Sequence, residues 1–251
     1  VMLYSTSAYN CQIEYSDDMY LLKRQALISL AGFLIAIGAS FFDYHILQQF
    51  TGILYVASAV GMFLVLTPLG VEVNGARRWL NIGLQFQPSE IAKIAVIVCL
   101  AFQIPQMRKE MKTFRGSAMI FLTGGSLGAI AYIVTNNLST AIIIIGITAG
   151  VLFVSHPYTK PFLLILAGVF AAAGAFVMIL DATMEKSSHF RFMRILVWLH
   201  PDKYAQGEGY QTLQALYAIG SGGLFGKGIG NSIQKLGSVP EAQNDMIFSI
   251  V

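Results

Sequence analysis

The run LSTAIIIIGITAGVLFV, residues 138–154, decides the fold of this chain. It is apolar all round, and an apolar helix of about 20 residues is what crosses a bilayer. Five further runs of this kind span residues 23–42, 50–69, 88–104, 117–135 and 161–180. Because partial spans also lie at both ends, the sequence predicts an all-α, polytopic bundle of transmembrane helices with six complete spans. Scattered Gly, Ala and Ser residues within the runs permit close helix packing.

The composition supports a membrane protein. Hydrophobic residues make up 55% of the chain and charged residues 12%, with a mean hydropathy of +0.64, whereas a soluble domain carries roughly 25% charged residues. The net charge of +3 is small, and no basic run alternates with polar surface, which argues against nucleic-acid binding. Cys11 lies in a polar segment and Cys99 in an apolar run, so no disulfide framework is indicated. Alternating strands of about ten residues, which a membrane β-barrel needs, are not found.

The loop at residues 106–116 decides the predicted orientation. It carries four basic residues against one acidic residue: Arg108, Lys109, Lys112, Arg115 and Glu110. Short basic loops stay in the cytoplasm, so alternation of sides puts 70–90 and 181–245 outside. The latter is expected to be a long extracytoplasmic loop with amphipathic helices, because FRFMRILVWLH at 190–200 alternates basic and apolar residues.

Polar residues gather before and within the start of the third complete span. NGARRWL, residues 74–80, precedes PSEIAK, residues 88–93, in which Glu90 and Lys93 share one helical face. The pair is either part of a capped helix that neutralises itself or the polar wall of a cavity, because an ionisable pair facing lipid is costly. The two adjacent arginines are either interfacial anchors or a bidentate phosphate site.

Two further motifs are polar. NNLST, residues 136–140, is typical of a tight turn with a helix cap. Its residues 137–139 also fit the N-glycosylation sequon, a signal that matters only in a eukaryotic secretory context. The glycine-rich GSGGLFGK, residues 220–227, lacks the glycine and hydroxyl positions of a P-loop, but it permits close backbone approach to a ligand, with Lys235 nearby. Asp245 then opens another apolar run, where it is either a helix N-cap or a functional carboxylate at the membrane surface.

Three long motifs together resemble the SEDS family (shape, elongation, division and sporulation). They are GARRWLNIGLQFQPSEIAK at 75–93, NLSTA at 137–141, and the stretch from GYQ to MIFSI at 209–250. The resemblance covers essentially the whole chain and is closer to the division and sporulation members than to the elongation members. It implies a ten-helix protein of the bacterial plasma membrane, of which this chain would be a fragment. That fragment, residues 1–251, would form one membrane domain from the end of family helix 1 to the start of helix 8.

The resemblance also implies an activity, which is polymerisation of lipid II into peptidoglycan glycan strands at an outward-facing site. Its implied partners are a class B penicillin-binding protein and other divisome proteins. Asp245 matches the aspartate of the family pattern PE-A-x-x-D-F-I-F and is the expected catalytic residue, with Met246 in place of the first phenylalanine. The family's arginine–tryptophan and QPSE…K positions fall on Arg77, Arg78, Trp79, Glu90 and Lys93. The turn that reads QPDLGTA in relatives is TNNLSTA here, and its missing acid and glycine argue against a catalytic role.

The residues suit this chemistry. A carboxylate can accept the proton of an attacking sugar hydroxyl, and the cations Arg77, Arg78, Lys93 and Lys235 can stabilise the pyrophosphate leaving group. No cluster at metal-ligand spacing is present, although Asp245 with water and pyrophosphate oxygens could hold Mg²⁺ or Mn²⁺. Two alternatives stay open: a lipid II flippase that uses Asp245 for gating or proton coupling, and a scaffold that only recruits the transpeptidase.

Overall fold

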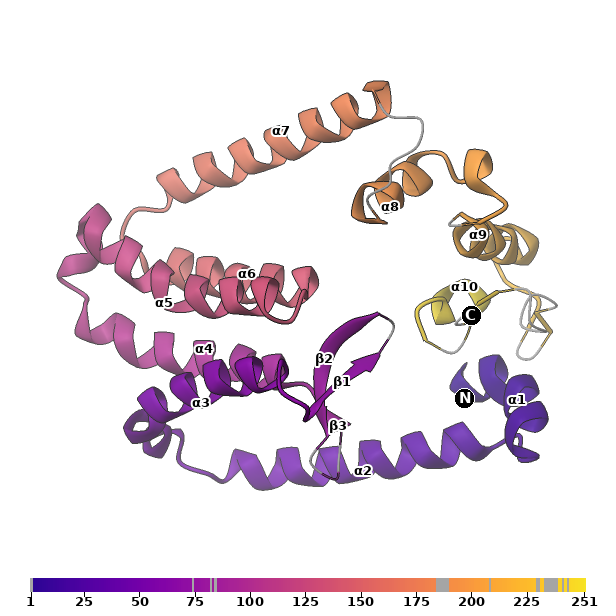
Figure 1. The fold of residues 1–251 in the computed structure, drawn as a ribbon, viewed down its shortest axis with the longest axis horizontal. Helices are drawn as coiled ribbons and strands as arrows, with labels where there is room; N and C mark the ends of the chain where they lie inside the picture. Colours follow the sequence, from indigo (N-terminus) through magenta and orange to yellow (C-terminus); the bar gives the residue numbers. More distant parts are fainter. Residues whose placement is uncertain are drawn as a thin grey trace. The chain divides into compact units, whose positions relative to one another are not determined.

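The structure, a computed structural model, describes residues 2–73, 75–81, 83, 85–183, 190–207, 209–228, 231–232, 239–240, 242 and 244–251. Figure 1 labels the α-helices (α) and the strands (β) along the chain; short 3-10 helices (η) lie between some of them. Their bounds are α1 Met2–Tyr15, α2 Tyr20–Ser40, η1 Tyr44–Phe50, α3 Thr51–Leu64, β1 Gly70–Val73, β2 Ala76–Asn81, β3 Gln85–Phe86, α4 Pro88–Gln106, η2 Glu110–Lys112, α5 Phe114–Ile133, α6 Leu138–Ser155, α7 Lys160–Thr183, α8 Phe190–Leu199, η3 Pro201–Tyr204, α9 Tyr210–Gly222 and α10 Ile247–Ile250.

Six helical stretches among the described residues are long and apolar enough to cross a membrane. They are Tyr20–Ser40, Tyr44–Leu64, Pro88–Gln106, Phe114–Ile133, Leu138–Ser155 and Lys160–Thr183. Each overlaps one predicted span, which confirms the helical membrane bundle. The second span differs most, since it was predicted at 50–69. There η1 leads directly into α3, and the chain leaves the helix at Val65 to enter a sheet at Gly70.

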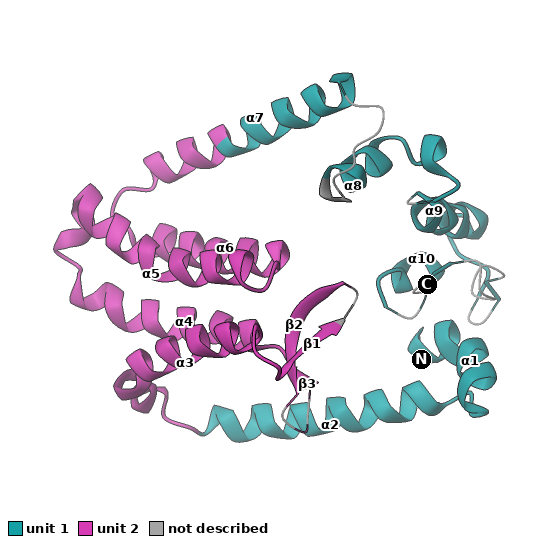
Figure 2. Cartoon of the chain, in the orientation of Figure 1, with its two compact units in different colours: residues 1–41, 169–251 teal, residues 42–168 magenta. Residues whose placement is uncertain are grey.

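The described chain divides into two compact units, coloured separately in Figure 2. Unit 1 comprises Val1–Phe41 and Val169–Val251, and unit 2 comprises Phe42–Gly168. Each unit is described by itself.

Unit 2 is built on the packing of α3, α4, α5 and α6, which contact one another. Side chains from all four helices form one buried core, among them Met62, Val96, Leu100, Leu127 and Ile144. Side chains cap the starts of α5 and α6: Thr113 Oγ1 accepts from the Gly116 N–H, and Asn137 Oδ1 accepts from the Thr140 N–H. The second cap confirms the tight-turn interpretation of the NNLST motif.

A glycine lets α5 and α6 approach each other closely. A Cβ added to Gly124 would clash with the Thr148 side chain, lying 2.8 Å from its Cβ. Thr148 is fully buried and donates a hydrogen bond of 2.8 Å to the Ile144 carbonyl. The threonine therefore has little freedom to move aside, and small residues at such contacts are what hold membrane helices together.

We expect Gly124→Ala to destabilise the protein by about 1–3 kcal/mol, because overpacking forces the helices or the threonine to shift. Thermal unfolding in detergent measures the effect. Gly125→Ala is the matched control, since its added Cβ would lie 3.7 Å from the nearest atom, on the Phe121 ring, which is ordinary contact. Equal stability of the two variants would contradict the close contact.

Unit 2 also contains a small sheet that the predicted spans do not include. Strand β2 pairs antiparallel with β1 on one side and with β3 on the other. Residues 74–75, between β1 and β2, read Asn-Gly, which is the strongest short-range signal for a β-hairpin. Gly75 has φ +74, a conformation that glycine adopts without strain. The sheet joins the end of α3 to the start of α4.

Unit 1 contains α1, α2, most of α7 and the helices that follow it. Helix α9 contacts η3 and α10, and α1 contacts both α2 and α10. Helix α8 returns against the end of α7: the Phe176 and Phe192 rings lie 5.8 Å apart, and His200 Nε2 lies 2.8 Å from Asp181 Oδ1. The helix predicted at 190–200 is thus confirmed, whereas its position at a membrane surface stays a prediction.

Candidate functional site

The predicted site residues fall on both units. Arg77, Arg78, Trp79, Glu90 and Lys93 belong to unit 2, and Asp245 belongs to unit 1. Lys235 lies outside the described residues. The candidate residues therefore form two separate groups, one in each unit.

The hairpin in unit 2 contains a β-bulge. Val71 pairs with Trp79 but Glu72 pairs with Arg77, so Arg78 is an extra residue on β2 without a partner on β1. A bulge of this kind bends its strand and redirects a side chain. Leu80, which follows, is 1% exposed and anchors the strand in the core.

The bulge gives the two arginines separate partners. Arg78 Nη2 donates to the carbonyl oxygen of Asn136 at 3.0 Å, in the turn between α5 and α6. Arg77 Nε lies 3.8 Å from Glu72 Oε2 on the neighbouring strand, and both of these side chains are exposed. The Arg77 pair is thus a weak surface ion pair, whereas Arg78 attaches the hairpin to the α5–α6 turn.

Arg78 retains donor capacity after making this bond. Its Nε is buried and has no hydrogen-bond partner among the described residues. A buried N–H of this kind is costly to leave unsatisfied, and a guanidinium group can make two parallel bonds to an oxyanion. Of the two arginines, Arg78 is therefore the better placed to receive an anionic group.

Glu90 and Lys93 form an ion pair on the first turns of α4. Lys93 Nζ lies 2.7 Å from Glu90 Oε2. The Lys93 side chain is 23% exposed and the Glu90 side chain 57% exposed, so the lysine is held against the protein while the carboxylate is solvated. Helix α4 begins at Pro88, where a fixed φ favours helix initiation, and the acidic residue lies in its first turn. The predicted helix start and ion pair are both confirmed.

Asp245 is an exposed residue in the turn that precedes α10. The N-cap position of α10 is Met246, and no side-chain capping hydrogen bond is made there. The helix-cap interpretation therefore has no support in the geometry. Within the described residues, the Asp245 carboxylate takes part in no ion pair and no side-chain hydrogen bond.

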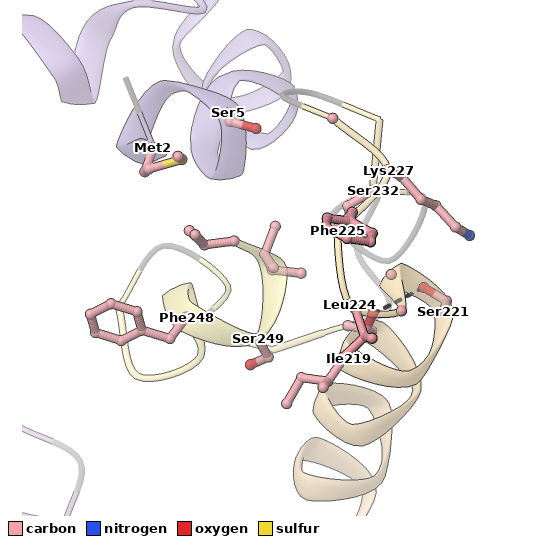
Figure 3. A pocket seen from close by; sticks show the side chains of 17 residues that line it. Met2, Ser5, Ile219, Ser221, Leu224, Phe225, Lys227, Ser232, Phe248 and Ser249 are labelled. Carbon is pink, nitrogen blue, oxygen red and sulfur yellow. Dashed lines mark hydrogen bonds between the residues drawn. The ribbon is translucent and has the colours of Figure 1, made fainter.

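The glycine-rich segment of unit 1 borders a cavity of about 410 Å³ (Figure 3). The end of α9, the loop after it, α10 and part of α1 line the cavity, with Ser221, Ser232 and Ser249 among the polar side chains. Gly223, at φ +59, ends α9, and such a conformation is strained for other residues. Figure 3 shows the Lys227 ammonium group pointing away from Phe248 and Ser249. Asp245 does not line this cavity.

Two contacts of the site were not anticipated from the sequence. Glu72 is the partner of Arg77, and the Asn136 carbonyl is the partner of Arg78. The Asn-Gly turn signal identifies the hairpin, and pairing across it brings Glu72 near the arginines. Every residue has a backbone carbonyl, so nothing in the sequence could indicate that Arg78 would bond to the one of Asn136. Among the described residues, no three His, Cys, Asp or Glu side chains gather as metal ligands.

The fold and these contacts define a multi-pass helical membrane protein with a polar site before its third span. A family model described as cell cycle protein, covering FtsW, RodA and SpoVE, matches residues 1–251. The chain therefore belongs to this family.

The relatives agree with this membership. The chain is 29% identical over 253 residues to a protein of Geobacter sp. (strain M18) named probable peptidoglycan glycosyltransferase FtsW, covering 100% of this chain and 67% of that protein. It is 32% identical over 254 residues to stage V sporulation protein E of Bacillus subtilis (strain 168), again covering 100% and 67%. A third, the probable peptidoglycan glycosyltransferase FtsW of Trichlorobacter lovleyi, is 31% identical, with 64% of its length covered. The chain thus spans about two thirds of these relatives.

Solved structures resemble the chain as well. One belongs to a peptidoglycan synthase complex that is described as coordinating polymerization and crosslinking. It has a TM-score of 0.58 and 28% identity, covering 89% of this chain and 64% of that chain. Another is a mutant of the Thermus thermophilus rod shape determining protein RodA, with a TM-score of 0.51, 22% identity and coverage of 87% and 70%. The second supports the fold alone.

Proposed function

We propose that the full-length protein is a peptidoglycan glycosyltransferase that polymerises lipid II into glycan strands. The names of the relatives support this activity, and the relatives match the chain over its whole length. The observation that carries the proposal is the state of Asp245. It is exposed at the start of an apolar segment, and helix capping does not occupy it.

In this proposal Asp245 is the general base. Its carboxylate accepts the proton of the acceptor sugar hydroxyl as that oxygen attacks the anomeric carbon of the lipid-linked donor. The bond from that carbon to the pyrophosphate oxygen breaks, and the lipid pyrophosphate leaves. A base at a membrane surface reaches the sugar while the lipid tail stays in the bilayer.

Cations of unit 2 receive the pyrophosphate in this proposal. Arg78 offers its unsatisfied Nε–H, and Lys93 offers an ammonium group that Glu90 holds in place. Preorganised donors stabilise developing charge without reorganisation in the reaction. Arg77 and Trp79 border this region on the same strand, and Lys235 stays a candidate from the sequence.

A divalent cation fits the site only in part. Asp245 would be the protein ligand, through its carboxylate. Mg²⁺ commonly uses one or two carboxylates together with phosphate oxygens and water. Bound Mg²⁺ or Mn²⁺ would neutralise charge on the leaving pyrophosphate.

We also propose a class B penicillin-binding protein as partner and the outer face of the bacterial plasma membrane as the place of the site. The similar synthase complex is described as coordinating polymerization with crosslinking, and in this proposal the class B protein is the partner that crosslinks. The basic loop at 106–116 supports the orientation, since basic loops stay in the cytoplasm.

The orientation predicts an outcome for cysteine labelling. In intact cells, a membrane-impermeant maleimide should modify a cysteine placed at Gln206 and should not modify one placed at Lys112. Both positions are exposed in the structure, so burial does not explain a difference. Labelling of the Lys112 position alone would reverse the orientation and move the site to the cytoplasm.

The function itself is tested with the purified full-length protein and its partner. Labelled lipid II should be converted into long glycan chains, resolved by gel electrophoresis. A parallel assay in vesicles follows movement of lipid II between leaflets. Leaflet exchange without chain formation would favour the flippase alternative, and neither activity would favour the scaffold.

A further inference from the structure

A groove that the proposed function does not use lies at the other end of α4. Its volume is about 410 Å³, and α3, α4 and α5 supply its walls together with Gln48 of η1. Helix α4 runs from Pro88 to Gln106, so Gln103 and Gln106 lie about 20 and 24 Å from Glu90 along the helix axis, at 1.5 Å per residue. The groove is therefore separate from the candidate site.

The groove is lined by apolar surface together with neutral polar side chains, and no charged residue is among the described residues that line it. Six neutral hydrogen-bonding side chains line it: Gln48, Thr51, Tyr55, Gln103, Gln106 and Thr123. The three hydroxyl groups are already used: that of Tyr55 donates to the Thr123 carbonyl at 3.1 Å, that of Thr51 to the Gln48 carbonyl and that of Thr123 to the Met119 carbonyl. The glutamines are the groups that remain to recognise a ligand.

Gln103 is incompletely satisfied. Its Oε1 is buried without a hydrogen-bond partner among the described residues, and its Nε2 faces the Met107 sulfur at 3.6 Å. A thioether is only a weak acceptor, so turning the amide over would leave the nitrogen unsatisfied instead. A hydroxyl group both donates and accepts, and it satisfies the free amide atom in either orientation.

A basic loop follows the groove at once. The chain after Gln106 is fixed to the end of α4, because the Met107 N–H donates to the Gln103 carbonyl and the Met111 N–H to the Met107 carbonyl. Met111 is 2% exposed in the core. The four cations of this loop take part in no ion pair of the described chain: Arg108, Lys109, Lys112 and Arg115.

Exposed apolar side chains lie on the same helices as these polar groups. Ile53 and Val56 on α3 and Leu122 on α5 are 65%, 59% and 66% exposed. Three kinds of surface thus match three parts of one lipid molecule. The apolar helix faces suit acyl chains, the basic loop suits a negative charge, and the glutamines suit hydroxyl groups.

We propose that this groove binds an anionic phospholipid with a hydroxylated head group, of the phosphatidylglycerol type. The glycerol hydroxyls bond to Gln103 and Gln106, and the phosphate lies against the cations of the loop. Serine or choline head groups satisfy only part of this surface, since choline lipids carry no net charge and a serine head offers charged groups where hydroxyls are needed.

Native mass spectrometry of the delipidated full-length protein tests the proposal, with dioleoyl phosphatidylglycerol, phosphatidylserine and phosphatidylcholine as probes. We expect phosphatidylglycerol to be retained about fivefold better than phosphatidylserine, the effect of one satisfied buried polar group. Phosphatidylserine should in turn exceed phosphatidylcholine, because of the loop. Equal retention of the two anionic lipids by the wild type would overturn the proposal.

Two variants separate the contributions. Gln103→Leu should abolish the preference for phosphatidylglycerol over phosphatidylserine and keep that of both over phosphatidylcholine. The double variant Lys109→Gln with Lys112→Gln should lower the retention of both anionic lipids toward that of phosphatidylcholine. Gln25→Leu, an exposed glutamine on α2, is the matched control and should change neither ratio.

A folding readout accompanies the lipid measurements. Gln103→Leu removes an unsatisfied polar atom, so thermal unfolding should be unchanged or slightly higher. Gln106→Leu, at an exposed position, provides an independent test should the first variant fail to fold. Undiminished preference for phosphatidylglycerol in both variants would exclude the glutamines as its source.

Discussion

Asp245→Asn is expected to reduce glycan polymerisation by about a hundredfold or more. The amide keeps the size of the side chain but cannot accept the proton of the attacking hydroxyl. Stability should change by less than about 0.5 kcal/mol, since the side chain is exposed and makes no capping bond. The measurement is chain formation from labelled lipid II by the full-length protein with its partner, alongside thermal unfolding.

Asp202→Asn is the matched control. Asp202 is an exposed carboxylate in η3 of the same long segment, so general loss of negative charge would affect both variants alike. Asp245→Glu keeps a base and should retain more activity than the asparagine variant. Substantial polymerisation by Asp245→Asn would remove Asp245 from the catalytic role, whereas polymerisation lost with leaflet exchange kept would separate the two activities.

The second large effect is expected for Lys93→Met, which should lower polymerisation by about a hundredfold, the usual loss when one preorganised charge-stabilising donor is removed. Its effect on stability should stay within about 1 kcal/mol. The Glu90 carboxylate is 57% exposed, so losing its partner does not leave a buried charge. Single-turnover polymerisation rates and unfolding midpoints measure the two effects independently.

Lys23→Met serves as control for the loss of an ion-paired lysine. Lys23 Nζ lies 2.8 Å from Asp17 Oδ2 at an exposed position, and its replacement should leave polymerisation unchanged. The exchange of Glu90→Lys with Lys93→Glu restores a pair of the same kind but reverses the position of the cation. Full activity in that exchange would assign the pair a structural role only.

The helical part of the fold was accessible from sequence because lipid imposes a strong rule: a spanning segment must be long, apolar and internally hydrogen-bonded. All six spans follow that rule. The sheet does not, since its strands are short and lie between spans. Only the Asn-Gly dipeptide at 74–75 signalled the hairpin, because strands of 4, 6 and 2 residues are too short to show a clear alternating pattern.

The site divides in the same way. The ion pair of Glu90 and Lys93 was predictable because a helix places residues three apart on one face. The attachment of Arg78 to the Asn136 carbonyl was not, because it depends on a strand irregularity and on a contact 58 residues distant along the chain. Asp245 was singled out by its position before an apolar run, and the structure adds that capping does not explain it.

The irregular position of Arg78 has a consequence for sequence comparison and for evolution. Deleting that one codon would leave Val71 and Glu72 able to pair with consecutive residues of the opposite strand, so the hairpin would persist as a regular ladder. The hairpin would nevertheless lose its attachment to the turn between α5 and α6. A single-residue gap at this column in a related protein would therefore mark a change in how the connections between membrane spans are held together, even where every neighbouring residue is identical.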